Sequence, residues 1–294
     1  MKAAPFEYSR PTSVDEACAL LAAEDNARVI AGGQTLVPMM AMRLARPTRL
    51  IDINRIAELS YIRFEDDAIS IGATTRQCLL ERDKLIATTL PLLARAIPFI
   101  GHAATRARGT IGGSLANADP AAELPLIAIT LDAVFTYRVD RRTEKIGVRD
   151  FFIGPMTTSL PGDAILTSVE LPMWPGKVGV GFLEVNARRS DFAFVATAAQ
   201  VELTDDGRCK RIAIGIGAAT DFPIRLATVE EQLKGSTLDA AIVKDAVTQA
   251  LADVTPLSDL HASAKYRRRV AADLATRAVV DACSHARGRK LHAH

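Results

Sequence analysis

Two pairs of adjacent glycines, each followed by hydroxyl side chains, are the features of this sequence best suited to hold a ligand. Gly32-Gly33 follows the apolar segment 28–31, and Gly112-Gly113 lies in the run 106–120. Because glycine has no Cβ, such a turn can bring backbone N–H groups against a phosphate. Alone, each pair is a weak signal, since ordinary tight turns also contain glycine. Two of them suit a long ligand whose phosphates need one set of donors and whose ring and ribityl chain need another.

Each glycine pair lies beside a predicted helix that would fix it in place. Thr35 precedes a helix expected over 36–44, whose positive N-terminal end favours a pyrophosphate. In the second run, Asp119 is a natural N-cap and Pro120 a natural first helical residue. We therefore expect a helix from about residue 120 that anchors the exit of the loop 101–113.

Other signatures of chemistry are missing from the sequence. It has neither GxGxxG after the first strand nor GxxxxGK(S/T), which disfavours a nicotinamide-binding Rossmann fold and an NTPase. GxSxG and HExxH are also absent, and His102 and His261 are isolated. An iron–sulfur cluster needs about four converging thiolates, so the chain cannot hold one by itself. Its four cysteines are scattered without a CxxC pair: Cys18, Cys78, Cys209 and Cys283.

Length and composition indicate an ordinary globular protein of two or three domains, since the chain has 294 residues. Hydrophobic residues make up 49% and charged residues 24%. The net charge of +2 gives no field that would favour nucleic acid. No apolar run approaches the roughly 18 to 20 residues of a membrane helix, and residues 1–11 contain no secretory signal. We expect a cytoplasmic protein without membrane insertion.

Hydrophobic periodicity divides the chain into three units. The first reads as a βαβ-type unit, the second mixes strands with helices, and the third is an antiparallel meander with helices on one side. The predicted strands are 6–8, 28–31, 49–53, 69–72, 133–138, 148–152, 164–171, 179–186, 193–203 and 211–217; the predicted helices are 14–24, 36–44, 76–81, 90–97, 120–131, 227–233, 238–253 and 264–283.

At the two glycine runs the sequence resembles a known family. The segments AGGQTLVPMM, RLIDINRI and HAATRARGTIGGSLANADPAAELP are similar to the FAD-binding medium subunits of molybdenum hydroxylases, the family of xanthine dehydrogenase and carbon monoxide dehydrogenase. The resemblance continues through 150–152, 165–171, 188–193 and 263–268, so it covers nearly the whole chain.

The resemblance implies an α+β fold in three parts. A two-lobed FAD-binding domain of the PCMH/VAO type would comprise lobe 1, residues 1–57, and lobe 2, residues 58–175. A CO-dehydrogenase-flavoprotein C-terminal domain, an antiparallel sheet with helices, would follow over 176–285. The remaining residues, 286–294, are expected to be a frayed basic tail.

The resemblance also implies a set of cofactor-binding residues, but no catalytic residue and no metal ligand in this chain. Residues of both glycine runs would touch the FAD phosphates and ribityl chain, and others would approach the flavin or the adenosine. The first run supplies Ala31, Gly32, Gly33, Gln34 and Thr35; the second supplies Thr110, Ile111, Gly112, Gly113 and Ser114; Ile100, Gly101, Ile165, Leu166, Asp191 and Phe192 would lie by the flavin, and Glu123 by the adenosine.

Two further features modify this implied site. At Glu184 some family members carry lysine, so this chain has an acid where a cation near reduced flavin would stand. Arg106 and Arg108 flank the second glycine turn, where they could meet phosphate or a partner subunit or face solvent as surface arginines.

The implied function is electron transfer in a heterotrimer, or in a dimer of heterotrimers. A molybdopterin-binding large subunit would hydroxylate the substrate, a small subunit would carry two 2Fe-2S clusters, and FAD in this chain would pass the electrons to an external acceptor. Two alternatives are a stand-alone flavin-dependent oxidoreductase of the same superfamily and a non-catalytic scaffold that has lost flavin. The intact glycine runs argue against the scaffold. Neither run contains the histidine or cysteine that usually tethers flavin in the oxidases.

Overall fold

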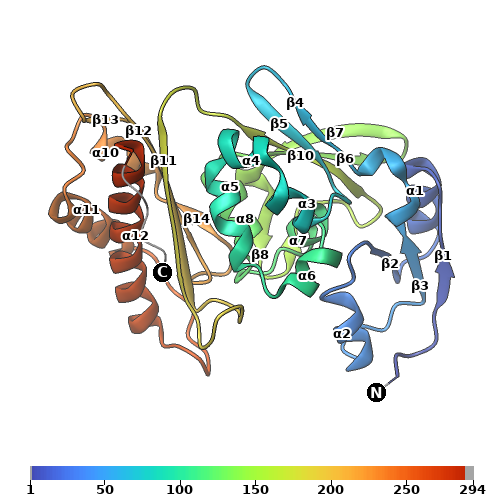
Figure 1. Ribbon diagram of the computed structural model, residues 1–294. Coiled ribbons are helices and arrows are strands. Elements are labelled where there is room, and N and C mark those ends of the chain that lie inside the picture. The colour runs from blue at the N-terminus through green and yellow to red at the C-terminus, as the bar shows by residue number, and fades with distance from the viewer. Residues whose placement is uncertain (1, 289–294) are drawn as a thin grey trace.

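The computed structural model describes residues 2–288, which form three consecutive units arranged side by side (Figure 1). Of the predicted tail 286–294, residues 289–294 lie outside the described residues, while Ala286 ends the last helix. The predicted α+β class is confirmed, because each unit combines a sheet with helices. Within the described part of the chain, no helix is long and apolar enough to cross a membrane.

The N-terminal unit is a small parallel sheet in the order β1-β3-β2. Ser13 caps its first helix as expected, since the side chain accepts a hydrogen bond from the N–H of Glu16 at 3.2 Å. The second helix ends three residues earlier than predicted, and Arg43 just beyond it has a positive φ of 60°. The elements are β1 (Glu7–Ser9), α1 (Val14–Ala22), β2 (Ala27–Ile30), α2 (Leu36–Ala41), β3 (Arg49–Asp52), and the short 3-10 turns η1 (Ile53–Arg55) and η2 (Ala57–Leu59).

The middle unit is a five-stranded antiparallel sheet, ordered β4-β5-β10-β6-β7, with a group of short helices packed beside it. Its strands are β4 (Ile62–Phe64), β5 (Ala68–Gly72), β6 (Val134–Val139), β7 (Arg142–Gly147) and β10 (Ile165–Pro172), with the small pair β8 (Phe152–Gly154) and β9 (Thr157–Thr158). Its helices are α3 (Gln77–Arg82), α4 (Lys84–Thr89), α5 (Pro91–Ala96), η3 (Ile97–Phe99), α6 (Ala103–Arg108), α7 (Ile111–Asn117), α8 (Glu123–Thr130) and α9 (Val148–Phe151).

Three expectations for this unit are wrong. The segment 148–152 is not a strand, because Val148–Phe151 forms the helix α9 and β8 begins only at Phe152. The segment 101–113 is not a loop, because α6 and the beginning of α7 occupy most of it. The next helix does not begin at Pro120, since its first residue is Glu123 and its N-cap is Ala122. Asp119 instead accepts a hydrogen bond from the N–H of Ala121 at 2.9 Å, which holds a turn before the helix.

The C-terminal unit is an antiparallel sheet in the order β11-β12-β13-β14, followed by three helices, as the meander pattern predicts. The long last helix runs across this sheet (Figure 1). The approach is so close that a Cβ at Gly181 would overlap the carbonyl oxygen of Ala278. The elements are β11 (Val178–Val185), β12 (Val195–Leu203), β13 (Cys209–Gly217), β14 (Ile224–Arg225), α10 (Ala227–Leu233), α11 (Ala240–Ala252) and α12 (Ala264–Ala286).

The expectation that helices cover this sheet on one side only is wrong. Helices α5 and α8 of the middle unit pack against the strands from the other side, and a Cβ at Gly215 would overlap the Thr130 hydroxyl of α8. As a result, β12 is buried along nearly its whole length rather than on alternate residues. The two units therefore share an extensive core, with Phe182 of β11 packed against Phe99 of the middle unit.

Candidate functional site

The first glycine turn lies directly against Arg108 and Gly109, the residues that lead into the second glycine turn. A Cβ added to Gly32 would stand 2.6 Å from the carbonyl oxygen of Arg108 and 2.8 Å from the Cα of Gly109. Any side chain at position 32 would therefore push the turns apart. Gly33 needs its freedom for a different reason, since its φ of +69° is a left-handed conformation.

The first turn presents unpaired backbone donors. Within residues 2–288, no protein acceptor pairs with the N–H groups of Gly33, Gln34 and Thr35. These residues precede the first turn of α2, where N–H groups have no partner inside the helix. Three such donors beside the helix N-terminus, on a surface with no Cβ at two positions, form a site with the right chemistry for a phosphate.

The second turn differs, because its backbone N–H groups from Ile111 to Ser114 already donate within the protein. The N–H of Ile111 donates to the Thr75 carbonyl at 3.1 Å, and that of Gly112 to the Ala73 carbonyl at 2.9 Å. Thr110 caps α7: its hydroxyl accepts from the Gly113 N–H at 3.0 Å, and its carbonyl accepts from Ser114 at 3.2 Å. The second turn is therefore packed into the middle unit, and the first turn lies against the two residues directly before it, Arg108 and Gly109.

Ile100 and Gly101 form a corner held by one arginine. Arg106 donates to the carbonyls of Ile100 at 3.1 Å and Gly101 at 2.9 Å, and also binds both carboxylate oxygens of Glu81 at 2.9 Å. Arg106 is thus engaged within the protein rather than facing solvent, with its side chain only 11% exposed. Helix α6 joins this corner to the second glycine turn, so it connects two predicted parts of the site.

Buried carboxyl groups line the boundary between the middle and C-terminal units. Burial raises the pKa of Glu123, the first residue of α8, to about 7, and the nearby Asp119 charge raises it further while Arg106 opposes this. Burial, followed by the charge of Glu123, raises the pKa of Glu184 on β11 to about 8. Glu184 Oε1 accepts from Asn186 at 2.8 Å, whereas its Oε2 is buried without a partner among the described residues. At neutral pH, Glu184 is therefore mainly protonated.

Asp191 and Phe192 lie in the connection between β11 and β12. Asp191 forms an ion pair with Arg188 at 3.1 Å, and its carbonyl accepts from Asn186 at 3.3 Å. Phe192 is a large apolar side chain that is 68% exposed among the described residues. Arg267 of α12 fixes the end of the connection, because its guanidinium donates to the Phe194 carbonyl at 2.5 Å.

Ile165 and Leu166 do not line an open surface. Neighbouring residues of a strand point to opposite faces, so Ile165 packs in the core of the N-terminal unit and Leu166 in the core of the middle unit. Both are at least 95% buried, with exposed fractions of 2% and 5%. A contact with a flavin ring would require this region to open.

Sequence reasoning missed Asn54 and Arg76, which join the two glycine turns. Asn54 donates to the Ala31 carbonyl at 2.8 Å and accepts from the Arg76 guanidinium at 2.6 Å. The only sequence signal for Asn54 is that it is a polar residue two positions after the end of β3. Arg76 has none, because its role depends on contact between segments distant in the chain.

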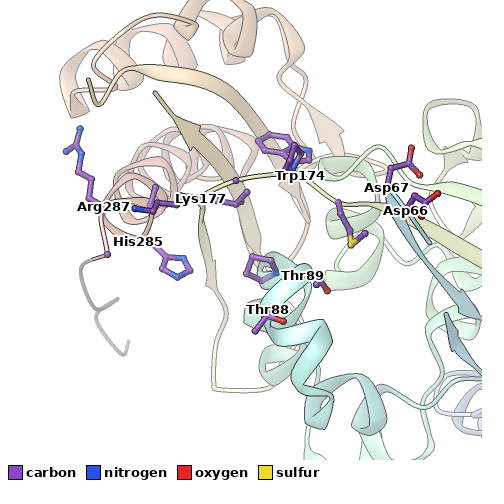
Figure 2. A pocket seen from close by; sticks show the side chains of 15 residues that line it. Asp66, Asp67, Thr88, Thr89, Trp174, Lys177, His285 and Arg287 are labelled. Carbon is purple, nitrogen blue, oxygen red and sulfur yellow. The ribbon is translucent and has the colours of Figure 1, made fainter. Parts of the chain in front are cut away.

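A cavity of about 820 Å³ lies elsewhere, between the middle and C-terminal units (Figure 2). Acidic Asp66 and Asp67 stand at one end, with His285 and Lys177 at the other. Because none of the predicted cofactor residues lines this cavity, it is separate from the candidate site. Within the part of the chain that the structure describes, no three His, Cys, Asp or Glu side chains gather as metal ligands, and all four cysteines are free.

Comparison with known proteins agrees with this arrangement. Residues 4–174 match the family model described as FAD binding domain in molybdopterin dehydrogenase, and residues 181–282 match the CO dehydrogenase flavoprotein C-terminal domain. The 6-hydroxypseudooxynicotine dehydrogenase complex subunit alpha of Paenarthrobacter nicotinovorans is 38% identical, over 99% of this chain and 98% of the relative. The carbon monoxide dehydrogenase medium chain of Afipia carboxidovorans is 32% identical, over 96% and 98%.

Solved structures show the same fold. A chain of the Hydrogenophaga pseudoflava carbon monoxide dehydrogenase superposes with a TM-score of 0.93 at 32% identity, covering 97% of this chain and 99% of that one. A chain of quinoline 2-oxidoreductase from Pseudomonas putida 86 gives 0.92 at 32% identity, with the same coverage. The chain therefore belongs to the family of FAD-binding medium subunits of molybdopterin-dependent dehydrogenases.

Proposed function

We propose that this chain binds FAD along the contact between its N-terminal and middle units and passes electrons to an external acceptor within a molybdopterin-dependent dehydrogenase. The observation that carries the proposal is the set of unpaired N–H groups at Gly33, Gln34 and Thr35, held against the packed second turn. The proposed units are lobe 1 over 1–57, lobe 2 over 58–175 and the C-terminal domain over 176–285. The matched family ranges support the division near residue 175.

The fit of FAD to these residues rests on donor chemistry and on space. The first turn, Ala31 to Thr35, would hold the diphosphate through its free N–H groups and the Thr35 hydroxyl. The second turn, Thr110 to Ser114, would contribute close packing and the Ser114 hydroxyl, because its N–H groups from Ile111 to Ser114 are already bonded. Glycine is required in both turns because a Cβ would stand 2.4 to 3.1 Å from other atoms of the protein, so its absence lets the backbone pack closely.

The remaining predicted residues would surround the flavin end of the cofactor. The partnerless Oε2 of Glu184 supports this, because a buried carboxyl oxygen without a hydrogen bond is unfavourable until a ligand or water satisfies it. As a protonated acid, Glu184 would act as a hydrogen-bond donor, where a lysine would act as a cation. Ile100 and Gly101 would form one wall, Asp191 and Phe192 would exclude water on the opposite side, and Glu123 would lie by the adenosine. FAD itself supplies the ability to exchange electrons singly or in pairs.

The proposal requires partner subunits. Relatives of nearly the same length are named as a subunit or a medium chain of larger enzymes. We therefore propose a small subunit with 2Fe-2S clusters, a molybdopterin-binding large subunit, and a dimer of such heterotrimers. We also propose a cytoplasmic location, which the free thiols at all four cysteine positions support.

The partner proposal is tested by purifying the complex through an affinity tag on this chain in its source cells. Mass spectrometry should identify a large molybdopterin-type chain and a small cysteine-rich chain, and metal analysis should find molybdenum and iron in stoichiometric amounts. Recovery of this chain without those partners, while it alone oxidises substrate, would contradict the proposal and favour a stand-alone flavoenzyme.

A further inference from the structure

Arg76 crosses from the middle unit to the N-terminal unit where the two glycine turns meet. Its backbone pairs with Thr110 in an isolated antiparallel bridge, so the residue belongs to the wall formed by the second turn. Its guanidinium reaches Asn54, whose Oδ1 accepts a hydrogen bond at 2.6 Å. Asn54 in turn donates to the carbonyl of Ala31 at 2.8 Å, at the start of the first turn.

The same guanidinium closes a ring of contacts around the junction. It donates a second hydrogen bond to the carbonyl oxygen of Arg108. That oxygen is also the nearest atom to a Cβ placed on Gly32, at 2.6 Å. The ring therefore runs from Ala31 through Asn54, Arg76 and Arg108 to Gly32. Neither turn can shift against the other without breaking one of these contacts.

The charge at this junction is positive, because the nearby carboxylate of Asp52, which accepts hydrogen bonds from Asn54, offsets the repulsion between Arg76 and Arg108 only in part. Within residues 2–288, neither Arg76 nor Arg108 forms an ion pair with a carboxylate, and the two guanidinium groups are close enough to repel. Burial lowers the pKa of Arg76, and the charge of Arg108 lowers it further. A partly buried cation beside another cation is unfavourable unless an anion compensates for it.

We propose that Arg76 is the positioning residue for the diphosphate of the cofactor: it holds the free N–H groups of the first turn in register with the second turn, and together with Arg108 it supplies positive charge. This inference rests on the proposed function, in which FAD occupies these turns. Arginine suits the role because its planar guanidinium reaches two acceptors at fixed angles, whereas the lysine ammonium is a single point charge.

The test compares Arg76→Ala, Arg76→Lys and Asn54→Ala in the full-length chain freed of flavin. The matched control is Arg82→Ala, since Arg82 is an exposed arginine at the end of the adjacent helix α3. Binding of FAD and of riboflavin is measured by flavin fluorescence, and thermal unfolding of each flavin-free variant is followed in parallel. Riboflavin lacks the diphosphate, so it reports on the ring end alone.

Arg76→Ala should weaken FAD binding by about tenfold or more, the loss expected for charge-assisted hydrogen bonds. Riboflavin affinity should change by less than about threefold, and Arg82→Ala should match the wild type. Arg76→Lys should remain clearly impaired, because it restores the charge but not the second hydrogen bond. Asn54→Ala should give a smaller loss, and the double variant should be no worse than Arg76→Ala, since both residues act through one contact.

Three results would overturn the inference. They are FAD affinity within twofold of wild type in Arg76→Ala, full rescue by lysine, and an equal loss of FAD and riboflavin together with a lowered unfolding temperature. If Arg76→Ala does not fold, Asn54→Ala decides, and its wild-type FAD affinity would count against the proposal. A wild-type chain that binds no FAD would instead refute the proposed function, and with it this inference.

Discussion

Replacing Gly32 by alanine should separate the two glycine turns and release the cofactor. The added Cβ would lie 2.6 Å from the Arg108 carbonyl oxygen, 2.8 Å from the Gly109 Cα and 3.1 Å from the Arg108 carbonyl carbon. All three are backbone atoms, so no flexible side chain can move aside. Ordinary van der Waals contact begins near 3.4 Å, and 3.4 minus 2.6 leaves 0.8 Å that the turns must open.

An opening of this size should affect both stability and binding. Overpacking of this kind costs about 1 to 3 kcal/mol of the free energy of unfolding. The same displacement moves the free donors of the first turn away from the diphosphate, so FAD affinity should fall by about tenfold to a hundredfold, the equivalent of about 1.4 to 2.8 kcal/mol. FAD titration of the flavin-free chain and urea unfolding measure the two effects.

The matched control is Gly162→Ala, since a Cβ at Gly162 meets nothing within 4 Å. This variant should keep wild-type stability and FAD affinity. If Gly32→Ala also binds FAD as the wild type does, the contact between the turns is not what creates the site, and the reasoning is refuted.

Three further predictions concern the framework around the site. Gly181→Val should lower the free energy of unfolding by about 3 kcal/mol or more in urea denaturation, because its side chain would collide with the backbone of Ala278; wild-type stability would show that α12 can move away. Arg225→Ala should lower the free energy of unfolding by about 3 to 5 kcal/mol, because it leaves the buried Glu230 carboxylate without its cation. Arg225 also pairs with Asp132, and Arg149→Ala, which removes an exposed second partner of Asp132, should lower it by under about 1 kcal/mol. Equal effects of the two variants would contradict this. The pKa of Glu184 is raised to about 8, so its contribution to stability is complete below the ordinary glutamate pKa and is lost as pH rises through about 8. Between pH 5 and 9, Glu184→Gln should therefore lose less of its free energy of unfolding than the wild type. Parallel pH profiles of the two proteins in urea unfolding would argue against a buried acid.

The sequence predicted the elements with local signals and missed those decided by distant contacts. Ser13 capped its helix as expected, and the three long strands of the C-terminal sheet lie close to their predicted positions. The predicted loop 101–113 contains α6 and the start of α7, and only α7 has glycines that disfavour a helix locally. Thr110 and the packing of Gly112 on Ala73 reverse that preference in the folded chain.

The second covered face of the C-terminal sheet shows the same limit. The helices that cover this face, α5 and α8, come from the preceding unit. No pattern within the strands of the C-terminal sheet could therefore predict them. A signal was nevertheless present in β12, whose sequence VATAAQVEL contains few polar residues, as in strands buried on both faces.

The sequence pointed to both glycine turns as the candidate site, but it did not show which backbone donors stay free. The glycine pairs pointed to both turns, yet the sequence could not reveal that the donors of Ile111 and Gly112 bond within the protein while those of Gly33 to Thr35 stay free. Nor could it reveal Asn54 and Arg76, because their importance comes from a contact between two units. The acid at Glu184 was noticed in the sequence, whereas its raised pKa depends on burial beside Glu123.

The most direct test of the central claim is the amount of FAD released from the purified complex per copy of this chain. After heat denaturation and removal of protein, chromatography of the supernatant should recover about one FAD for each chain, with no flavin left on the polypeptide. A complex with its full content of molybdenum and iron but without flavin would contradict the account, as would flavin that stays covalently attached to this chain.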